Sequence, residues 1–226
     1  MWMVKQVCCS TGGNPAKATI GQAKETTLMI TTEKSSPTPP IASIPDLRSE
    51  PEGINFSVAV AVKGFGKLKI RPIQLDDEEE MIAFHKRLSK ESIYMRYFEF
   101  LGLDERTSHD RLVRICKNTG ESYAIVMEAA ATPHRLESIL AVGRITTTDK
   151  PYVATFDTLI VTEKNELHLA KVLIKQLVKL ARAFGFQTLT TELLVADHDT
   201  LNLCRGLGFS SHSLLEDGLV RVTHEL

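Results

Sequence analysis

The stretch YVATFDTLIVTEKNELHLAKVLIKQLVKLARAFG, residues 152–185, reads as a strand, a short turn and a long helix. Residues 152–161 form a strand-like run, and residues 167–185 form the strongest amphipathic helix of the chain. α/β enzymes commonly hold a phosphate at such a turn, because the helix N-terminus offers backbone amides and a favourable dipole. This turn has no glycine, so the stretch by itself fits a phosphate cradle and a plain turn alike.

The helix is recognised by its spacing. Its apolar residues recur at intervals of three and four, its basic residues face away, and Gly185 ends it. The apolar face consists of Leu169, Val172, Leu173, Leu177, Leu180, Ala181 and Phe184, and the basic face of Lys171, Lys175, Lys179 and Arg182.

Shorter elements surround this unit. Alternating and apolar runs predict strands at 56–62, 67–73, 122–130, 137–146, 187–195, 209–215 and 219–226, the first two forming a hairpin. Helical patterns predict helices at 76–89, 109–118 and 197–208. Asp76 is the expected cap of the first of these helices.

The first part of the chain differs in composition from the rest. It is rich in Ser, Thr, Pro, Gly and Lys, and Lys5 and Gln6 interrupt its apolar start. We expect residues 1–53 to be a disordered tail, without core contacts up to about residue 50, and residues 54–226 to form one domain. An organelle transit peptide is the alternative, which the absence of arginine before Arg48 disfavours.

The net charge and the distribution of cysteines and histidines limit the partners, compartment and metal sites that we expect. The net charge of −1 gives no reason to expect a nucleic-acid or membrane partner. The four cysteines are scattered, without a C-x-x-C motif, which is typical of a reducing compartment, so we expect a cytoplasmic protein. The seven histidines are dispersed as well, and no metal site is expected.

Two segments carry a resemblance to a known family. IRPIQLDDEEEMIAFHKRLSKESIYMRYF, residues 70–98, and LGFSSHSLLEDGLVRVTHEL, residues 207–226, resemble the ends of GCN5-related N-acetyltransferase (GNAT) domains. The nearest resemblance is to the GNAT domain of bacterial protein-lysine acetyltransferases. It covers about residues 67–226 and implies an α/β (α+β) fold: a mixed, mostly antiparallel sheet flanked by helices, with two parallel strands that splay apart near Asp157 and Glu192.

The resemblance also implies where acetyl-CoA binds. In GNAT domains the strand before the long helix presents backbone groups to the pantetheine arm, and a Gln/Arg-x-x-Gly-x-Gly/Ala turn holds the pyrophosphate. Here Asn165 takes the Gln/Arg position, His168 the first glycine and Ala170 the second small residue, so the cradle is expected to be degenerate. The implied cofactor-binding residues are Leu159, Ile160, Val161, Asn165, His168, Leu169, Ala170 and Lys171. As a plain turn, Asn165 would cap the helix and His168 would lie exposed.

The implied acid–base residues are altered too. Thr155 stands where lysine-acetylating relatives have a glutamate base, and Asp157, two residues on, is the replacement candidate on the same strand face. Glu192 is a second candidate base. Cys204 stands where many GNAT enzymes have a tyrosine that protonates the leaving thiolate. A free cysteine at such a position is more often a small buried apolar residue than an acid.

Two functions of different classes follow. The first is an N-acyltransferase that moves an acetyl or other acyl group from acyl-CoA to a primary amine, either a protein lysine or a small amine. The second is a catalytically degenerate GNAT-like module that binds acyl-CoA or a protein partner and regulates. The sequence leaves the acceptor, the acyl group and the oligomeric state open.

Overall fold

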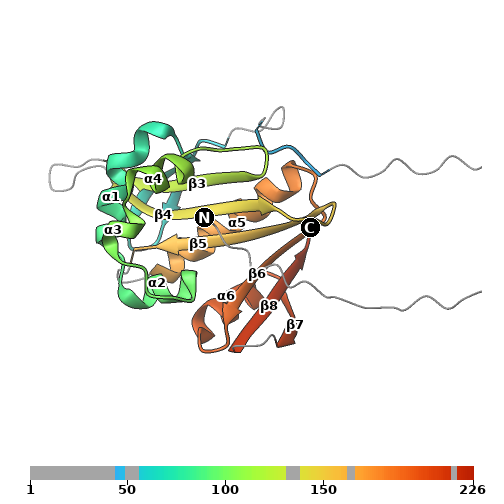
Figure 1. Cartoon of the computed structure of the whole chain (residues 1–226). Coiled ribbons are helices and arrows are strands. Elements are labelled where there is room, and N and C mark those ends of the chain that lie inside the picture. The colour runs from blue at the N-terminus through green and yellow to red at the C-terminus, as the bar shows by residue number, and fades with distance from the viewer. Residues whose placement is uncertain (1–43, 49–55, 131–137, 162–165, 215–217) are drawn as a thin grey trace, which may run out of the picture. The chain divides into compact units, whose positions relative to one another are not determined.

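A single mixed sheet organises the residues from 44 onward (Figure 1). The structure is a computed structural model that describes residues 44–48, 56–130, 138–161, 166–214 and 218–226. Its eight strands lie in the order β1-β2-β3-β4-β5-β6-β8-β7. Every neighbouring pair is antiparallel except β5 and β6, which run parallel. The predicted mixed, mostly antiparallel sheet is confirmed.

The elements have the following bounds. The strands are β1 (Val58–Val62), β2 (Gly66–Pro72), β3 (Ser122–Ala129), β4 (Ser138–Thr147), β5 (Val153–Ile160), β6 (Thr188–Leu194), β7 (Ser210–Leu214) and β8 (Leu219–Glu225). The helices are the short 3₁₀ turn η1 (Leu75–Asp77), α1 (Glu78–Lys86), α2 (Lys90–Tyr97), α3 (Leu103–Arg106), α4 (His109–Ile115), α5 (Glu166–Ala183) and α6 (His198–Gly206). None of the described helices is long and apolar enough to cross a membrane.

Adjacent residues of β4 show how the two faces of the sheet are covered. A Cβ atom on Gly143 would stand 2.9 Å from Leu177 Cδ1 and 3.1 Å from Leu173 Cγ, so this face lies directly on α5. The next residue, Arg144, points to the other face and donates a hydrogen bond to the carbonyl of Ile115 in α4. Helix α5 therefore covers one face and the α1–α4 layer covers the other (Figure 1).

The long helix matches its sequence pattern closely. Leu169, Leu173, Leu177 and Ala181 of α5 are fully buried. The helix ends two residues before Gly185, whose φ of +83° is the left-handed conformation that favours glycine. The prediction of an amphipathic helix stopped at Gly185 is confirmed.

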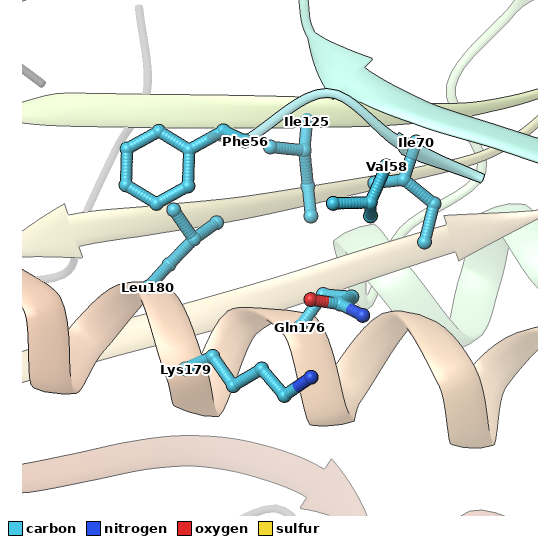
Figure 2. A pocket seen from close by; sticks show the side chains of 7 residues that line it. All are labelled: Phe56, Val58, Ile70, Ile125, Gln176, Lys179 and Leu180. Carbon is cyan, nitrogen blue, oxygen red and sulfur yellow. The ribbon is translucent and has the colours of Figure 1, made fainter. Parts of the chain in front are cut away.

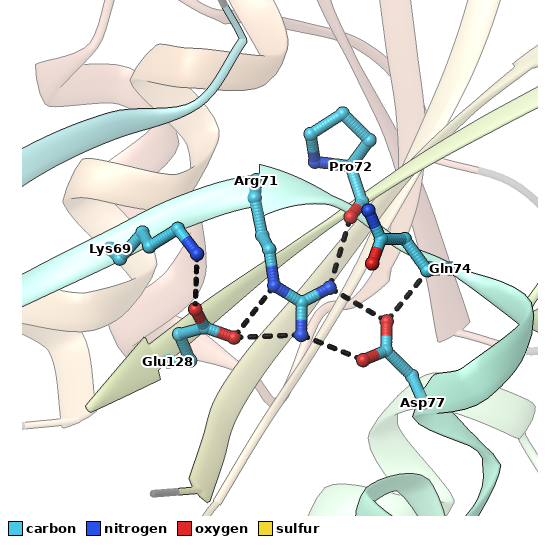
Figure 3. Close-up of polar contacts among 6 residues, drawn as sticks. All are labelled: Lys69, Arg71, Pro72, Gln74, Asp77 and Glu128. Atoms are coloured by element: carbon cyan, nitrogen blue, oxygen red, sulfur yellow. Dashed lines mark hydrogen bonds and ion pairs between the residues drawn. The ribbon is translucent and has the colours of Figure 1, made fainter. Parts of the chain in front are cut away.

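The start of α1 departs from the prediction, because Asp77 and not Asp76 stands at its N-cap. The Asp77 carboxylate accepts hydrogen bonds from the Gln74 amide at 2.7 Å and from the Arg71 guanidinium at 2.7 and 2.8 Å. Arg71 also donates to Glu128 at 2.8 Å, and Lys69 lies 3.1 Å from Glu128 (Figure 3). The two carboxylates raise the pKa of Arg71, with the Asp77 hydrogen bond as the largest cause. This network fixes α1 against β2 and β3.

Residues 44–48 correct a second expectation. Leu47 is fully buried within the main core, and its amide donates to the Gly120 carbonyl at 3.0 Å. The prediction that residues up to about 50 make no core contacts is therefore wrong at Leu47. A single buried leucine has no periodicity by which the sequence could reveal it. The rest of the predicted tail up to residue 43 lies outside the described residues.

The α1–α4 layer encloses a buried histidine. His85 of α1 is only 1 % exposed, and its backbone carbonyl accepts a hydrogen bond from Arg106 at 3.0 Å. Burial is the largest cause that lowers the pKa of His85, and together with the charges of Arg106 and Arg111 it brings this pKa to about 4. His85 is therefore neutral in the folded protein at pH 7.

Replacing Leu47 by alanine should lower the free energy of unfolding by about 2–5 kcal/mol, because the substitution leaves a cavity in the core. The matched control is Ile44→Ala, since Ile44 is 46 % exposed and surface changes usually stay within about 0.5 kcal/mol. Urea denaturation of both variants measures the difference. Equal, small losses would show that residues 44–48 do not dock in solution.

Acid should destabilise the fold through His85. The unfolded chain takes up a proton near the ordinary histidine pKa of about 6.5, whereas the folded protein resists it until pH 4, so stability falls as pH drops through this window. Relative to pH 7, the His85 contribution at pH 5 should be about 2 kcal/mol lower. Denaturant titrations at both pH values should show a smaller loss in His85→Leu. His109→Gln, at an exposed histidine whose pKa Glu78 raises, should keep the full acid loss.

Candidate active site

A gap between two parallel strands defines the candidate site. β5 and β6 pair only at Val153–Thr188, Ala154–Leu189 and Thr155–Thr190, although β5 continues to Ile160 and β6 to Leu194. The predicted parallel pair that splays near Asp157 and Glu192 is confirmed, since the register ends two residues before each of them. α5 begins beyond the open end of β5.

The backbone of β5 turns alternate groups toward this gap. The Val161 amide donates a hydrogen bond of 3.0 Å to the carbonyl of Leu140 in β4. By the alternation of an antiparallel ladder, the polar groups of Leu159 also face β4, and those of Thr158 and Ile160 face the gap. Of the strand residues predicted to bind the cofactor, Ile160 thus presents its backbone to the gap. Thr158 also presents its backbone to the gap. It was not predicted, because a sequence alone does not show which strand residues direct their backbone groups toward the gap.

The start of α5 determines which amides can meet an anion. Since helical N–H groups bond to the carbonyl four residues earlier, the amides of Leu167 and His168 have no acceptor within the helix. The amides of Ala170 and Lys171 lie inside the helical ladder, and the side chains of Leu169 and Ala170 are buried. Asn165 lies outside the described residues.

The burial of His168 differs from what the plain-turn interpretation expected. It is half-buried rather than exposed, so the plain-turn picture of an exposed first turn is wrong for this residue. Its Nδ1 atom is buried and has no hydrogen-bond partner among the described residues. A buried nitrogen of this kind is costly unless a ligand or water satisfies it. The half-buried ring also occupies space at the helix start that a glycine would leave open.

Asp157, the first candidate base, is held in an ion pair. Its two carboxylate oxygens lie 3.1 and 2.8 Å from Nε and a terminal nitrogen of Arg96 on α2. Arg144 is its register partner on β4 and adds a second buried positive charge nearby. A general base must direct a lone pair at the amine that it deprotonates, whereas here both oxygens are directed at a guanidinium. Thr155, two residues earlier, only donates a long hydrogen bond of 3.4 Å to Thr146.

Glu192, the second candidate, is paired as well. Its carboxylate accepts a hydrogen bond of 2.6 Å from Arg221, its register partner on β8. The two side chains are 38 % and 47 % exposed, so the pair contributes little to stability. The structure thus puts Asp157 and Glu192 on opposite sides of the gap, each with an arginine.

Cys204 has the buried environment that the sequence suggested. It is 1 % exposed, and burial raises the pKa of its thiol to about 12. Because a thiol of this pKa is a weaker acid than an ordinary thiol of about 8.5, donation of its proton to a departing CoA thiolate would be uphill. Cys204 is therefore a packing residue in α6.

The α2 region forms one wall beside β5. The guanidinium groups of Arg96 and Arg111 both lie over the Tyr97 ring, with central carbons 5.2 and 5.3 Å from the ring centroid. Tyr94 and Phe100 stack on each other at 4.9 Å and are both exposed, Phe100 at 72 %. An aromatic and cationic surface thus lies beside Asp157, and its residues Tyr94, Arg96 and Tyr97 belong to the segment 70–98 that resembles GNAT domains.

The part of the chain that the structure describes contains no group of three or more His, Cys, Asp or Glu residues that could hold a metal ion.

Acyl transfer from a thioester needs a polarised carbonyl and a neutral amine. The splayed strand and the helix start can supply backbone dipoles for the first requirement.

Solved structures share this arrangement. The GNAT domain of Streptomyces lividans PAT superposes with a TM-score of 0.65 at 21 % identity over 76 % of this chain and 97 % of that domain. RimJ of Mycobacterium smegmatis, solved in complex with CoA-disulfide, gives a TM-score of 0.60 at 12 % identity over 78 % of this chain and 90 % of that protein. A GCN5-related N-acetyltransferase from Kribbella flavida gives 0.54 at 15 % identity, over 70 % of this chain and 98 % of that protein.

No protein-family model matches the chain, so its class follows from its shape rather than from a sequence signature. The structures superpose on this chain over most of their own length, with TM-scores of 0.54 to 0.65. The protein has the GNAT fold.

Proposed function

We propose that the protein is an N-acyltransferase that moves an acetyl or related acyl group from acyl-CoA to a primary amine. The observation that carries the proposal is the separation of β5 and β6 after Thr155–Thr190, with the start of α5 beyond it. In the proposed complex, strand dipoles would face the pantetheine arm and helix amides would face the pyrophosphate. The fold that it shares with acetyltransferases supports the same activity.

The cofactor would lie along the gap. The backbones of Thr158 and Ile160 would hydrogen-bond the amide groups of the pantetheine arm. The amides of Leu167 and His168 would meet the pyrophosphate at the helix start. A backbone N–H facing the gap would polarise the thioester carbonyl. The resemblance of the turn to the family motif adds Asn165 and Lys171 to the same site, with His168 in place of the usual glycine.

The acceptor would approach from the side of α2. Its amine would enter beside Asp157 and attack the thioester carbon directly, with CoA leaving as a thiolate. Asp157 remains our first candidate for the base and Glu192 the second. For Asp157 to take a proton, its ion pair with Arg96 has to open when the acceptor binds, or a water molecule has to relay the proton.

We further propose a protein lysine or a small amine as the acceptor and the cytoplasm as the compartment. The exposed stack of Tyr94 and Phe100 supports a bulky acceptor, because exposed aromatic surface beside a site commonly contacts a partner.

A non-catalytic acyl-CoA-binding module is the second candidate. It is favoured by one specific set of contacts: both candidate bases are ion-paired, and Thr155 stands in the position of the family's glutamate. The backbone dipoles would still bind an acyl-CoA in such a module, so binding and turnover have to be measured separately.

Turnover should separate a base from a structural ion pair. Release of free CoA thiol from acetyl-CoA in the presence of a lysine-rich protein is the assay. If Asp157 is the base, Asp157→Asn should lower the rate by about 100-fold or more, while Arg96→Gln should preserve or raise it by freeing the carboxylate. Thr155→Glu, which restores the family's acid, should raise the rate. Equal losses in Asp157→Asn and Arg96→Gln would instead show that the pair only holds α2 on β5.

Binding should respond to His168. Replacing His168 with glycine should tighten acetyl-CoA binding by about tenfold, or ~1.4 kcal/mol, if relief of crowding outweighs the helix cost of glycine of at most ~1 kcal/mol. Calorimetric titration measures it. Lys175→Gly on the exposed side of α5 is the control, because it introduces a glycine into the interior of the same helix, away from the turn. If wild type and His168→Gly both fail to bind at millimolar ligand, the turn is a plain turn and the acyl-CoA proposal fails.

A further inference from the structure

The strand β1 forms one edge of the sheet and is unusually apolar for an edge. Its sequence is VAVAV, residues 58–62, and among the described residues it pairs only with β2. Natural edge strands are commonly protected by charge, proline or irregularity, because their open backbone groups can pair with another strand. β1 contains neither a charge nor a proline. The opposite edge, β7, reads SSHSL and is mostly polar.

The open backbone groups of β1 can be assigned from one hydrogen bond. The Phe65 amide donates to the Val62 carbonyl at 3.0 Å, so the polar groups of Val62 face the β2 side of the hairpin. Since the direction alternates along a strand, the backbone groups of Val60 and Val58 face β2 as well, and those of Ala59 and Ala61 face outward. Two N–H and two C=O groups thus point away from the sheet edge.

The sequence of β1 reads the same in both directions. An antiparallel copy centred on Val60 would place Val60 opposite Val60, Ala59 opposite Ala61, and Val58 opposite Val62. This register makes Ala59 and Ala61 the hydrogen-bonded pairs and gives four interstrand hydrogen bonds, because their groups are the ones that face outward. A two-fold axis requires a self-complementary surface, and a palindromic strand meets that requirement. Just outside the strand, Ser57 would face Lys63, so no like charges oppose each other.

A crevice beside β1 adds a second, independent feature. It has a volume of about 150 Å³ between the sheet and α5, and its lining consists of Phe56, Val58, Ile70, Ile125, Gln176, Lys179 and Leu180 (Figure 2). Figure 2 shows apolar side chains of the sheet facing Leu180, with Gln176 and Lys179 on the helix below. In the register above, Val62 of a second copy would stand opposite Val58, and side chains of directly opposed residues lie on the same sheet face. The second copy would therefore extend the apolar lining of this crevice.

We propose that two copies of this chain associate through β1, antiparallel and centred on Val60, to form one continuous sheet across a two-fold axis. The contact is short, because each strand contributes five residues. A contact of this length falls below the area of about 1,200–2,000 Å² that stable complexes bury, so the dimer is weak and forms at high protein concentration. The association does not depend on the activity of the gap between β5 and β6.

Sedimentation velocity over a concentration series up to about 0.5 mM tests the association, in the range expected of a small interface. Wild type should shift from monomer toward dimer as concentration rises. Ala61→Pro removes an outward N–H and places a ring at the contact, and proline is tolerated on an edge where that N–H faces solvent. This variant should remain monomeric. Ala61→Val keeps the N–H and should associate like wild type. Unchanged thermal melting of both variants verifies folding.

The register has its own test. Paired residues of a non-hydrogen-bonded site approach closely enough for a disulfide, so Val60→Cys should form a cross-linked dimer under mild oxidation. Val58→Cys should not, because position 58 faces position 62 of the other copy. Wild type provides the background from the native cysteines. A monomeric wild type at the highest concentration, equal behaviour of Ala61→Pro and Ala61→Val, or cross-linking at 58 rather than 60 would each overturn the proposal.

Discussion

The parallel pairing of β5 and β6 stops after three residue pairs, and the rest of the candidate site depends on this constraint. Two strands that diverge leave backbone dipoles without a ladder partner, which is costly in a protein interior unless a ligand or water satisfies them. The crossover between them is α5, whose buried leucines lie against Gly143 of β4. The close packing of α5 against β4 holds the N-terminal turn of α5 at the open end of β5. Strand dipoles and helix amides thus converge at the candidate site because of packing elsewhere in the fold.

The charged side chains around the gap are held in ion pairs. Asp157 and Glu192 each face an arginine, and Arg144 adds a buried charge whose pKa burial lowers. Both candidate bases, Asp157 and Glu192, thus have an arginine as ion-pair partner. The backbone part of the site, by contrast, requires no particular side chains. The proposed acyl-CoA binding therefore depends on backbone geometry more than on the side chains around the gap.

The fold could be predicted from the sequence where periodicity is strong. The spacing of α5 and the alternation of β1, β2 and β8 reflect one buried face each, which is what sequence patterns record. Leu47, α2 and α3 were missed, because a single buried leucine or a helix of one or two turns has too few repeats to show a period. At the site, Asp157 could be placed on the correct strand face, but its pairing with Arg96 spans 61 positions and has no sequence signal. The half-burial of His168 likewise depends on how α5 sits on the sheet.

The strand order has a consequence for how the chain reaches this state. β8 is the last strand in sequence, yet it lies between β6 and β7. β7 has no other neighbour among the described strands, and β6 touches β5 at only three residue pairs. Because a domain generally folds as a unit, the wall that carries β6 can form only together with residues 219–225, with which β6 pairs along its whole length. β8 therefore completes the sheet, and the gap has two sides only once residues 219–225 are paired with β6.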